Sequence, residues 1–150
     1  MPRILRQPCL VSIGYEGRNL DDLVSQLVVN AVDVLVDVRL NPISRKPGLS
    51  KRRLAEALEQ VGIQYVHRRE LGNPKNNRDA FRAGSDAAVQ RFWEILKTAG
   101  GEAALTQVEN DLACQVVALL CFERDHGTCH RGIVVEAIRK DLPALQLVTV

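Results

Sequence analysis

Aromatic residues are scarce in this chain of 150 residues, where Phe, Trp and Tyr together make up 4%. The hydrophobic core must therefore rest on Leu, Val, Ile and Ala, which dominate the 46% of residues that are hydrophobic. The same scarcity argues against a protein that binds single-stranded nucleic acid by stacking bases on aromatic rings.

Membrane and metal signals are also missing. No apolar run approaches the length that a bilayer requires, and the first residues lack the apolar core of a signal peptide, so we expect a soluble, cytoplasmic protein. The four cysteines include no Cys-x-x-Cys pair, so their spacing predicts no structural zinc site, and we expect no cofactor. In a reducing compartment these thiols would be free.

Length and charge narrow the possible partners. One hundred and fifty residues suit a single domain spanning residues 1–150. The formal net charge is only +2, but the segment 39–82 holds eleven Lys and Arg against four Asp and Glu. This asymmetry predicts an anionic partner for the middle third, with a solvated basic face as the equally open alternative.

Strand-like and helix-like patterns alternate along the chain. Short apolar runs predict strands at residues 9–13, 32–38, 63–66, 116–121 and 145–148. Apolar residues at helical spacing predict helices at 20–28, 54–61, 87–99 and 133–138. This order predicts an α/β fold of the Rossmann-like type: one domain in three layers, with a mainly parallel sheet and helices on both faces.

Two regions give weaker patterns. The polar stretch 68–86 predicts a functional loop or lid, because it is long and has little apolar periodicity. Gly100 and Gly101 are expected to end the helix before them, and residues 102–112 suit either another helix or an irregular segment.

In a parallel sheet, ligands bind at the carboxyl ends of the strands, so the residues there are the candidates for function. Tyr15 and Glu16 follow the first strand and are expected to bind a ligand, or to cap the next helix. His67 follows the third strand and can titrate near neutral pH, although a single histidine is more often structural.

The second strand is followed by Asp37, Arg39 and Arg45. An acid at the buried end of a strand needs a partner, so one interpretation is an Asp37–Arg39 pair that braces the loop. The alternative makes Asp37 a catalytic acid or base, while Arg39 and Arg45 hold a phosphate or carboxylate.

The fourth strand is followed by the densest set of reactive side chains. Cys121 and Glu123 are two residues apart, and Cys129 precedes the last helix, where the helix dipole and Arg131 are expected to lower its thiol pKa. Competing interpretations are a buried structural thiol, metal binding by both cysteines with His130 at a spacing unlike familiar zinc motifs, and a disulfide that the compartment disfavours.

These strand-end motifs together resemble the domain-of-unknown-function 488 (DUF488) family. The motifs are Gly14-Tyr-Glu-Gly17, Val36-Asp-Val-Arg39, Asn41-Pro42 with Ser44-Arg-Lys-Pro47, Tyr65-Val-His67, Glu70-Leu-Gly72, Leu120-Cys-Phe-Glu123 and Cys129-His-Arg131. The resemblance implies a small bacterial or archaeal α/β protein and supplies no activity. It adds Glu70 to the candidate polar residues. Leu49 and Arg68-Arg69 depart from the usual pattern. The Asp-Val-Arg tripeptide is also similar to sulfurtransferases of the rhodanese type, but their cysteine loop is absent.

Three functions remain open. We favour a pocket for a small anionic ligand, nucleotide-like or phosphorylated, with catalysis by Asp37, Glu123, Cys129 and His130 as a further step. The ligand would then be held by Tyr15, Glu16, Arg39, Arg45, His67, Glu70, Cys121 and Arg131. The alternatives are a nucleic-acid-binding module that uses the basic middle third, and a structural or interaction domain. Reaction type and oligomeric state do not follow from the sequence.

Overall fold

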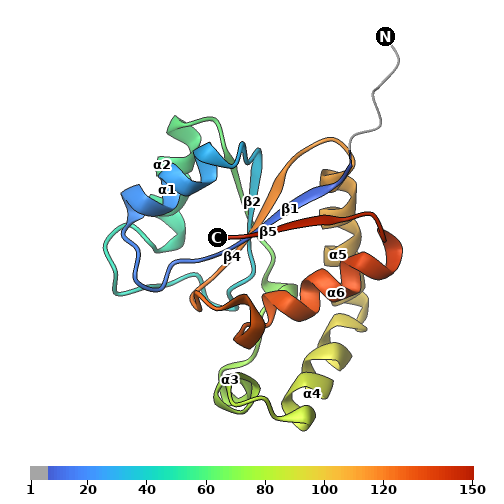
Figure 1. The fold of residues 1–150 in the computed structure, drawn as a ribbon. Coiled ribbons are helices and arrows are strands. Elements are labelled where there is room, and N and C mark those ends of the chain that lie inside the picture. Colours follow the sequence, from blue (N-terminus) through green and yellow to red (C-terminus); the bar gives the residue numbers. More distant parts are fainter. Residues whose placement is uncertain (1–6) are drawn as a thin grey trace.

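A computed structural model describes residues 7–150 as a five-stranded sheet between two layers of helices (Figure 1). The strand order is β3-β2-β4-β1-β5, and every neighbouring pair is parallel. The strands are β1 (Cys9–Gly14), β2 (Val34–Asp37), β3 (Gln64–His67), β4 (Val117–Cys121) and β5 (Gln146–Thr149). The predicted α/β fold with a parallel sheet and helices on both faces is confirmed.

Eight helical segments connect these strands within residues 7–150. The α-helices are α1 (Leu20–Val29), α2 (Lys51–Gln60), α3 (Lys75–Arg82), α4 (Asp86–Leu96), α5 (Ala99–Leu112) and α6 (Arg131–Asp141). Two single turns of 3₁₀-helix are η1 (Arg69–Leu71) and η2 (His126–Thr128). Within this part of the chain, no helix has both the length and the apolarity that a membrane crossing requires.

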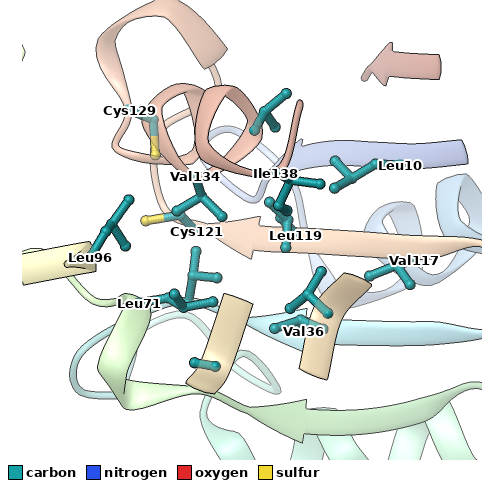
Figure 2. Packing of buried hydrophobic residues seen from close by; sticks show 14 of the residues in the cluster. Leu10, Val36, Leu71, Leu96, Val117, Leu119, Cys121, Cys129, Val134 and Ile138 are labelled. Carbon is teal, nitrogen blue, oxygen red and sulfur yellow. The ribbon is translucent and has the colours of Figure 1, made fainter. Parts of the chain in front are cut away.

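The two faces of the sheet bury separate cores, because side chains along a strand alternate between faces. Val11 and Ile13 of β1 pack with α1 and α2, whereas Leu10 packs on the other face with α4, α5 and α6. Figure 2 shows part of this second core, where Leu119 and Ile138 lie between β4 and α6. Leu, Val and Ile make up most of both cores, as the composition requires.

Two sequence expectations are wrong. The stretch 68–86 is not the expected long loop or lid, because it contains η1 and the whole of α3, and Phe81 of α3 packs on Phe92 of α4. Gly100 and Gly101 do not end the helix before them. That helix, α4, already ends at Leu96, and both glycines lie in the first turn of α5. The side chain of Thr98 caps that turn by accepting from the Gly101 amide at 3.1 Å.

The topology marks one edge of the sheet as the place for a site. From β1 the chain crosses through α1, on one face, to β2; from β4 it crosses through α6, on the other face, to β5. Strands β1 and β4 are neighbours whose connections leave in opposite directions, which opens a crevice beyond their carboxyl ends.

Candidate functional site

A cavity of about 190 Å³ lies at this crevice, beyond the ends of β1, β2 and β4. It lies where the alternation of strands and helices predicts a ligand site. Five of the twelve candidate residues line it: Tyr15, Arg39, Cys121, Glu123 and His130.

Close backbone packing shapes one wall of the cavity. A Cβ atom at Gly14 would collide with the carbonyl oxygen of Glu123, so only glycine lets the loop after β4 cross the end of β1. Beyond Gly14 the ladder continues, because the Tyr15 amide donates to Cys121 O at 3.2 Å. This packing brings Tyr15 to the same cavity as Cys121 and Glu123, although more than a hundred residues separate it from them in the sequence.

Asp37 is fully buried and paired with Arg39. Arg39 Nη2 and Nε donate to its two carboxylate oxygens at 2.7 and 2.9 Å, and the Tyr65 hydroxyl donates at 2.6 Å. Burial alone would lower the pKa of Arg39, but the Asp37 carboxylate raises it; burial and Asp37 both raise the pKa of Tyr65. The carboxylate is thus saturated with donors, and it lies behind the cavity wall instead of in it.

Arg39 links this buried pair to the cavity. Its Nη1 donates to Leu49 O at 2.7 Å, and its guanidinium lies 5.3 Å from the centre of the Tyr15 ring. Tyr15 in turn meets the Phe122 ring edge-to-face at a centroid distance of 5.4 Å. These contacts fix a cation and two rings along one side of the cavity.

Glu123 is the carboxylate that lines the cavity, with its side chain 14% exposed. Burial by itself would raise its pKa, but Arg82, whose Nη2 donates to Oε1 at 2.9 Å, lowers the pKa to about 2. Its other oxygen, Oε2, accepts from the Cys121 thiol at 3.3 Å. Glu123 is therefore ionised at neutral pH.

Cys121, Cys129 and His130 form a buried cluster beside Glu123. His130 Nδ1 lies 3.8 Å from Cys121 Sγ and 3.6 Å from Cys129 Sγ, and Nε2 lies 2.9 Å from Val38 O. Burial, followed by the neighbouring Cys121, raises the pKa of the Cys129 thiol. The expectation that this pKa is lowered is therefore wrong, because burial disfavours the thiolate.

A protein-family model now identifies the chain. The model described as "Domain of unknown function DUF488" matches residues 19–138, which is most of the chain. The chain belongs to this family. The resemblance read from the strand-end motifs is thereby confirmed. No curated protein and no solved structure matches the chain.

In this DUF488 domain, Arg131 is fully buried but does not line the cavity. Its Nη2 donates to Glu123 O, so it holds the loop after β4. Its Nε and Nη1 find no hydrogen-bond partner among residues 7–150. Arg131 thus positions Glu123 through the backbone of that residue.

Two further candidates contact backbone atoms instead of the cavity. Glu16 is exposed, and its Oε1 accepts from the Arg124 amide at 3.1 Å. His67 Nε2 lies 2.7 Å from Arg39 O, within hydrogen-bonding distance. Both side chains hold the loops of the DUF488 domain together beside the cavity.

Arg45 and Glu70 are both exposed and lie outside the cavity lining. The neighbour of Arg45, Lys46, is the residue that turns inward, where its Nζ donates to Tyr15 O at 3.1 Å. The alternation of exposed and half-buried side chains in this loop could not be predicted from the sequence, because the loop is not a regular helix or strand.

The DUF488 cavity also has polar and aromatic lining residues that the sequence did not single out. They are Asn41, Asn73, Arg78, Phe81, Arg82, Phe122 and Thr128. Arg78 and Arg82 are four residues apart on α3 and so share one face of that helix. A helix prediction for this segment would have paired them.

Proposed function

We propose that the cavity binds a small anionic ligand of the phosphorylated or nucleotide-like class. The observation that carries the proposal is the charge of the lining: three arginines, Arg39, Arg78 and Arg82, face a single carboxylate, Glu123. A guanidinium presents a planar pair of donors that matches a phosphate or carboxylate.

Arg78 is the arginine best placed to engage the ligand. Arg39 is occupied by Asp37, and Arg82 by Glu123. Arg78 uses only its Nε, which donates to Asn73 O at 3.2 Å, and no partner for its two terminal nitrogens is found within residues 7–150. These nitrogens supply the bidentate donor pair of the proposal.

Size and lining restrict the ligand further. At about 190 Å³ the cavity is smaller than the roughly 300–1,000 Å³ usual for drug-sized ligands, which favours a compact phosphorylated compound over a dinucleotide. The rings of Tyr15, Phe81 and Phe122 offer apolar surface to a sugar or a small planar group. Of the four residues expected to be catalytic, Glu123 and His130 line the cavity, whereas Asp37 and Cys129 lie behind its lining.

Isothermal titration calorimetry with inorganic phosphate, ribose 5-phosphate and adenosine monophosphate tests the proposal. We expect at least one phosphorylated probe to bind, and Arg78→Gln to weaken it about tenfold or more, since a hydrogen bond to a charged group contributes roughly 1.5–3 kcal/mol. Arg91→Gln, on the exposed face of α4, is the matched control and should bind like the wild type. Absence of binding by all three probes, or equal losses in the two variants, contradicts the proposal.

Titration with random oligonucleotides over a salt series tests the alternative that the protein binds nucleic acid through the basic middle third. The arginines of this segment are divided between the two faces of the sheet. The exposed Arg52 and Arg53 lie on α2, on one face, whereas Arg78 and Arg82 lie on α3, which packs on α4 on the other face. Binding through phosphates weakens steeply as salt rises. A flat response to salt, or no binding at low salt, rejects this alternative.

A further inference from the structure

Three ligand atoms that soft metal ions prefer converge at the end of β4. Cys121 Sγ, Cys129 Sγ and His130 Nδ1 all lie within 4.8 Å of one another, and all three residues are buried. Figure 2 shows Cys129 pointing from the segment before α6 toward the end of β4, where Cys121 lies. We propose that Cys121, Cys129 and His130 bind a zinc ion at the wall of the cavity.

The distances match a metal site. In tetrahedral zinc sites, bonds of about 2.3 Å to sulfur and about 2.0–2.1 Å to nitrogen place sulfur and nitrogen about 3.6 Å apart. The observed separations of His130 Nδ1 from the two sulfurs are 3.6 and 3.8 Å.

Without a metal, hydrogen bonds satisfy the two thiols separately. Cys121 Sγ donates to Glu123 Oε2 at 3.3 Å, and Cys129 Sγ, at 3.6 Å, is the thiol nearer to the lone pair of His130 Nδ1. Cys121 Sγ nevertheless lies 3.8 Å from the same Nδ1, so the three atoms surround one point that a cation can occupy. Metal binding would then displace both thiol protons.

The His130 ring is held in the orientation that metal binding needs. Its Nε2 lies 2.9 Å from Val38 O, which assigns the ring proton to Nε2 and leaves the Nδ1 lone pair for the metal. In metal-binding histidines, the N–H of the second ring nitrogen typically donates to a carbonyl or carboxylate in this way. Phe92 packs edge-to-face on the ring at 5.2 Å and restricts its rotation.

Charge and ligand type select the ion. Two thiolates neutralise a divalent cation, so the site can remain buried without a net charge. Sulfur and imidazole ligands suit zinc, whereas magnesium and calcium require oxygen. In the sequence, metal binding by these three residues was one of several interpretations, because ligands from a strand end and a separate loop match no familiar zinc spacing.

The fourth position faces the cavity. Cys121 and His130 line the cavity, and Glu123 Oε2 lies 3.3 Å from Cys121 Sγ. Three protein ligands with one open position is the arrangement of catalytic zinc, where the ion acts as a Lewis acid. This inference goes beyond anion binding, because the three protein ligands are in place without any anionic ligand.

Titration of the chelator-treated full chain with Co²⁺, which occupies the same sites as zinc and is coloured, tests the proposal. We expect one Co²⁺ per chain, a thiolate-to-cobalt charge-transfer band, and displacement by Zn²⁺. Cys121→Ser and Cys129→Ser should each weaken binding by about a hundredfold or more, and at saturation each should show a weaker band, because one thiolate remains. Cys9→Ser and Cys114→Ser, outside the cluster, are the matched controls and should keep the full band.

A second measurement uses the wild type alone and so does not depend on how the variants fold. Zn²⁺ should protect Cys121 and Cys129 from alkylation, located by mass spectrometry, while the exposed Cys114 reacts as before. The proposal is overturned if Co²⁺ does not bind, if Cys114→Ser abolishes the band, or if Zn²⁺ leaves alkylation of the cluster unchanged. A wild type that binds no metal and oxidises to a Cys121–Cys129 disulfide also overturns it.

Discussion

Among single side chains, Asp37 shows how a residue next to the cavity can serve the fold instead of the ligand. Its carboxylate accepts from the Arg39 side chain, the Arg39 amide and the Tyr65 hydroxyl. The pair that the sequence offered as one of two interpretations is thus present. With its oxygens fully engaged, Asp37 acts by fixing Arg39, and through Arg39 the side of the cavity that Tyr15 completes.

Asp37→Asn tests this positioning role. Removing one member of a buried ion pair leaves the other charge uncompensated, so we expect the free energy of unfolding to fall by about 3–5 kcal/mol. Tyr65→Phe is the graded control, because it removes one hydrogen bond to the same carboxylate and should cost less, about 1.5–3 kcal/mol. Urea denaturation followed by circular dichroism measures both, and an Asp37→Asn variant as stable as Tyr65→Phe would show that the pair is not a structural brace.

The corner between α4 and α5 illustrates the limits of sequence patterns for whole elements. Paired glycines usually end a helix, yet here the chain turns over residues 97–98 and both glycines start α5. A Cβ atom at Gly101 would lie 2.6 Å from Ile95 O, so the small residue is needed for the close approach of the two helices. Hydrophobic periodicity does not reveal such a close contact between two helices, so the sequence pattern did not predict this corner.

Replacing each glycine in turn separates close packing from helix propensity. Gly101→Ala should destabilise the protein by about 1–3 kcal/mol, because the new methyl group meets backbone atoms that cannot move aside. Gly100→Ala, whose nearest neighbour would be Glu70 Cγ at 3.4 Å, should stabilise by about 0.4–1 kcal/mol through a less flexible unfolded chain. Thermal unfolding of the two variants gives opposite shifts of the melting temperature; shifts of the same sign would contradict this account.

The strands and the α1 and α6 helices were predictable because burial on a parallel sheet imposes apolar runs and stripes that the sequence displays. Helix α3 was missed because only Asn77 and Phe81 of its eight residues are buried, so it has almost no apolar stripe. The candidate site was predictable in location and only partly in membership. The sequence shows which residues follow a strand. Whether the side chain of such a residue, for example Arg131, enters the cavity depends on packing between distant segments.

At the scale of the whole molecule, the free energy of unfolding is expected to depend on pH through Glu109, a carboxyl group outside the cavity lining. Glu109 of α5 lies beside Asp141 at the end of α6. Burial, followed by the neighbouring Asp141 carboxyl, raises the pKa of Glu109 to about 7 from an ordinary 4.5. Because the folded pKa is the higher one, the unfolded chain releases this proton first as pH rises.

Stability should therefore decline between about pH 4.5 and 7 and stay level above that range as far as Glu109 is concerned. Glu109 is partly exposed, so solvent screening reduces the loss to about 1 kcal/mol. Glu109→Gln should abolish this decline, whereas Glu102→Gln, exposed on the same helix, should retain it. Urea unfolding of the three proteins at about pH 5 and pH 8 measures the difference. If Glu109→Gln loses as much stability as the wild type between these two pH values, the raised pKa of Glu109 beside Asp141 is not the cause of the decline.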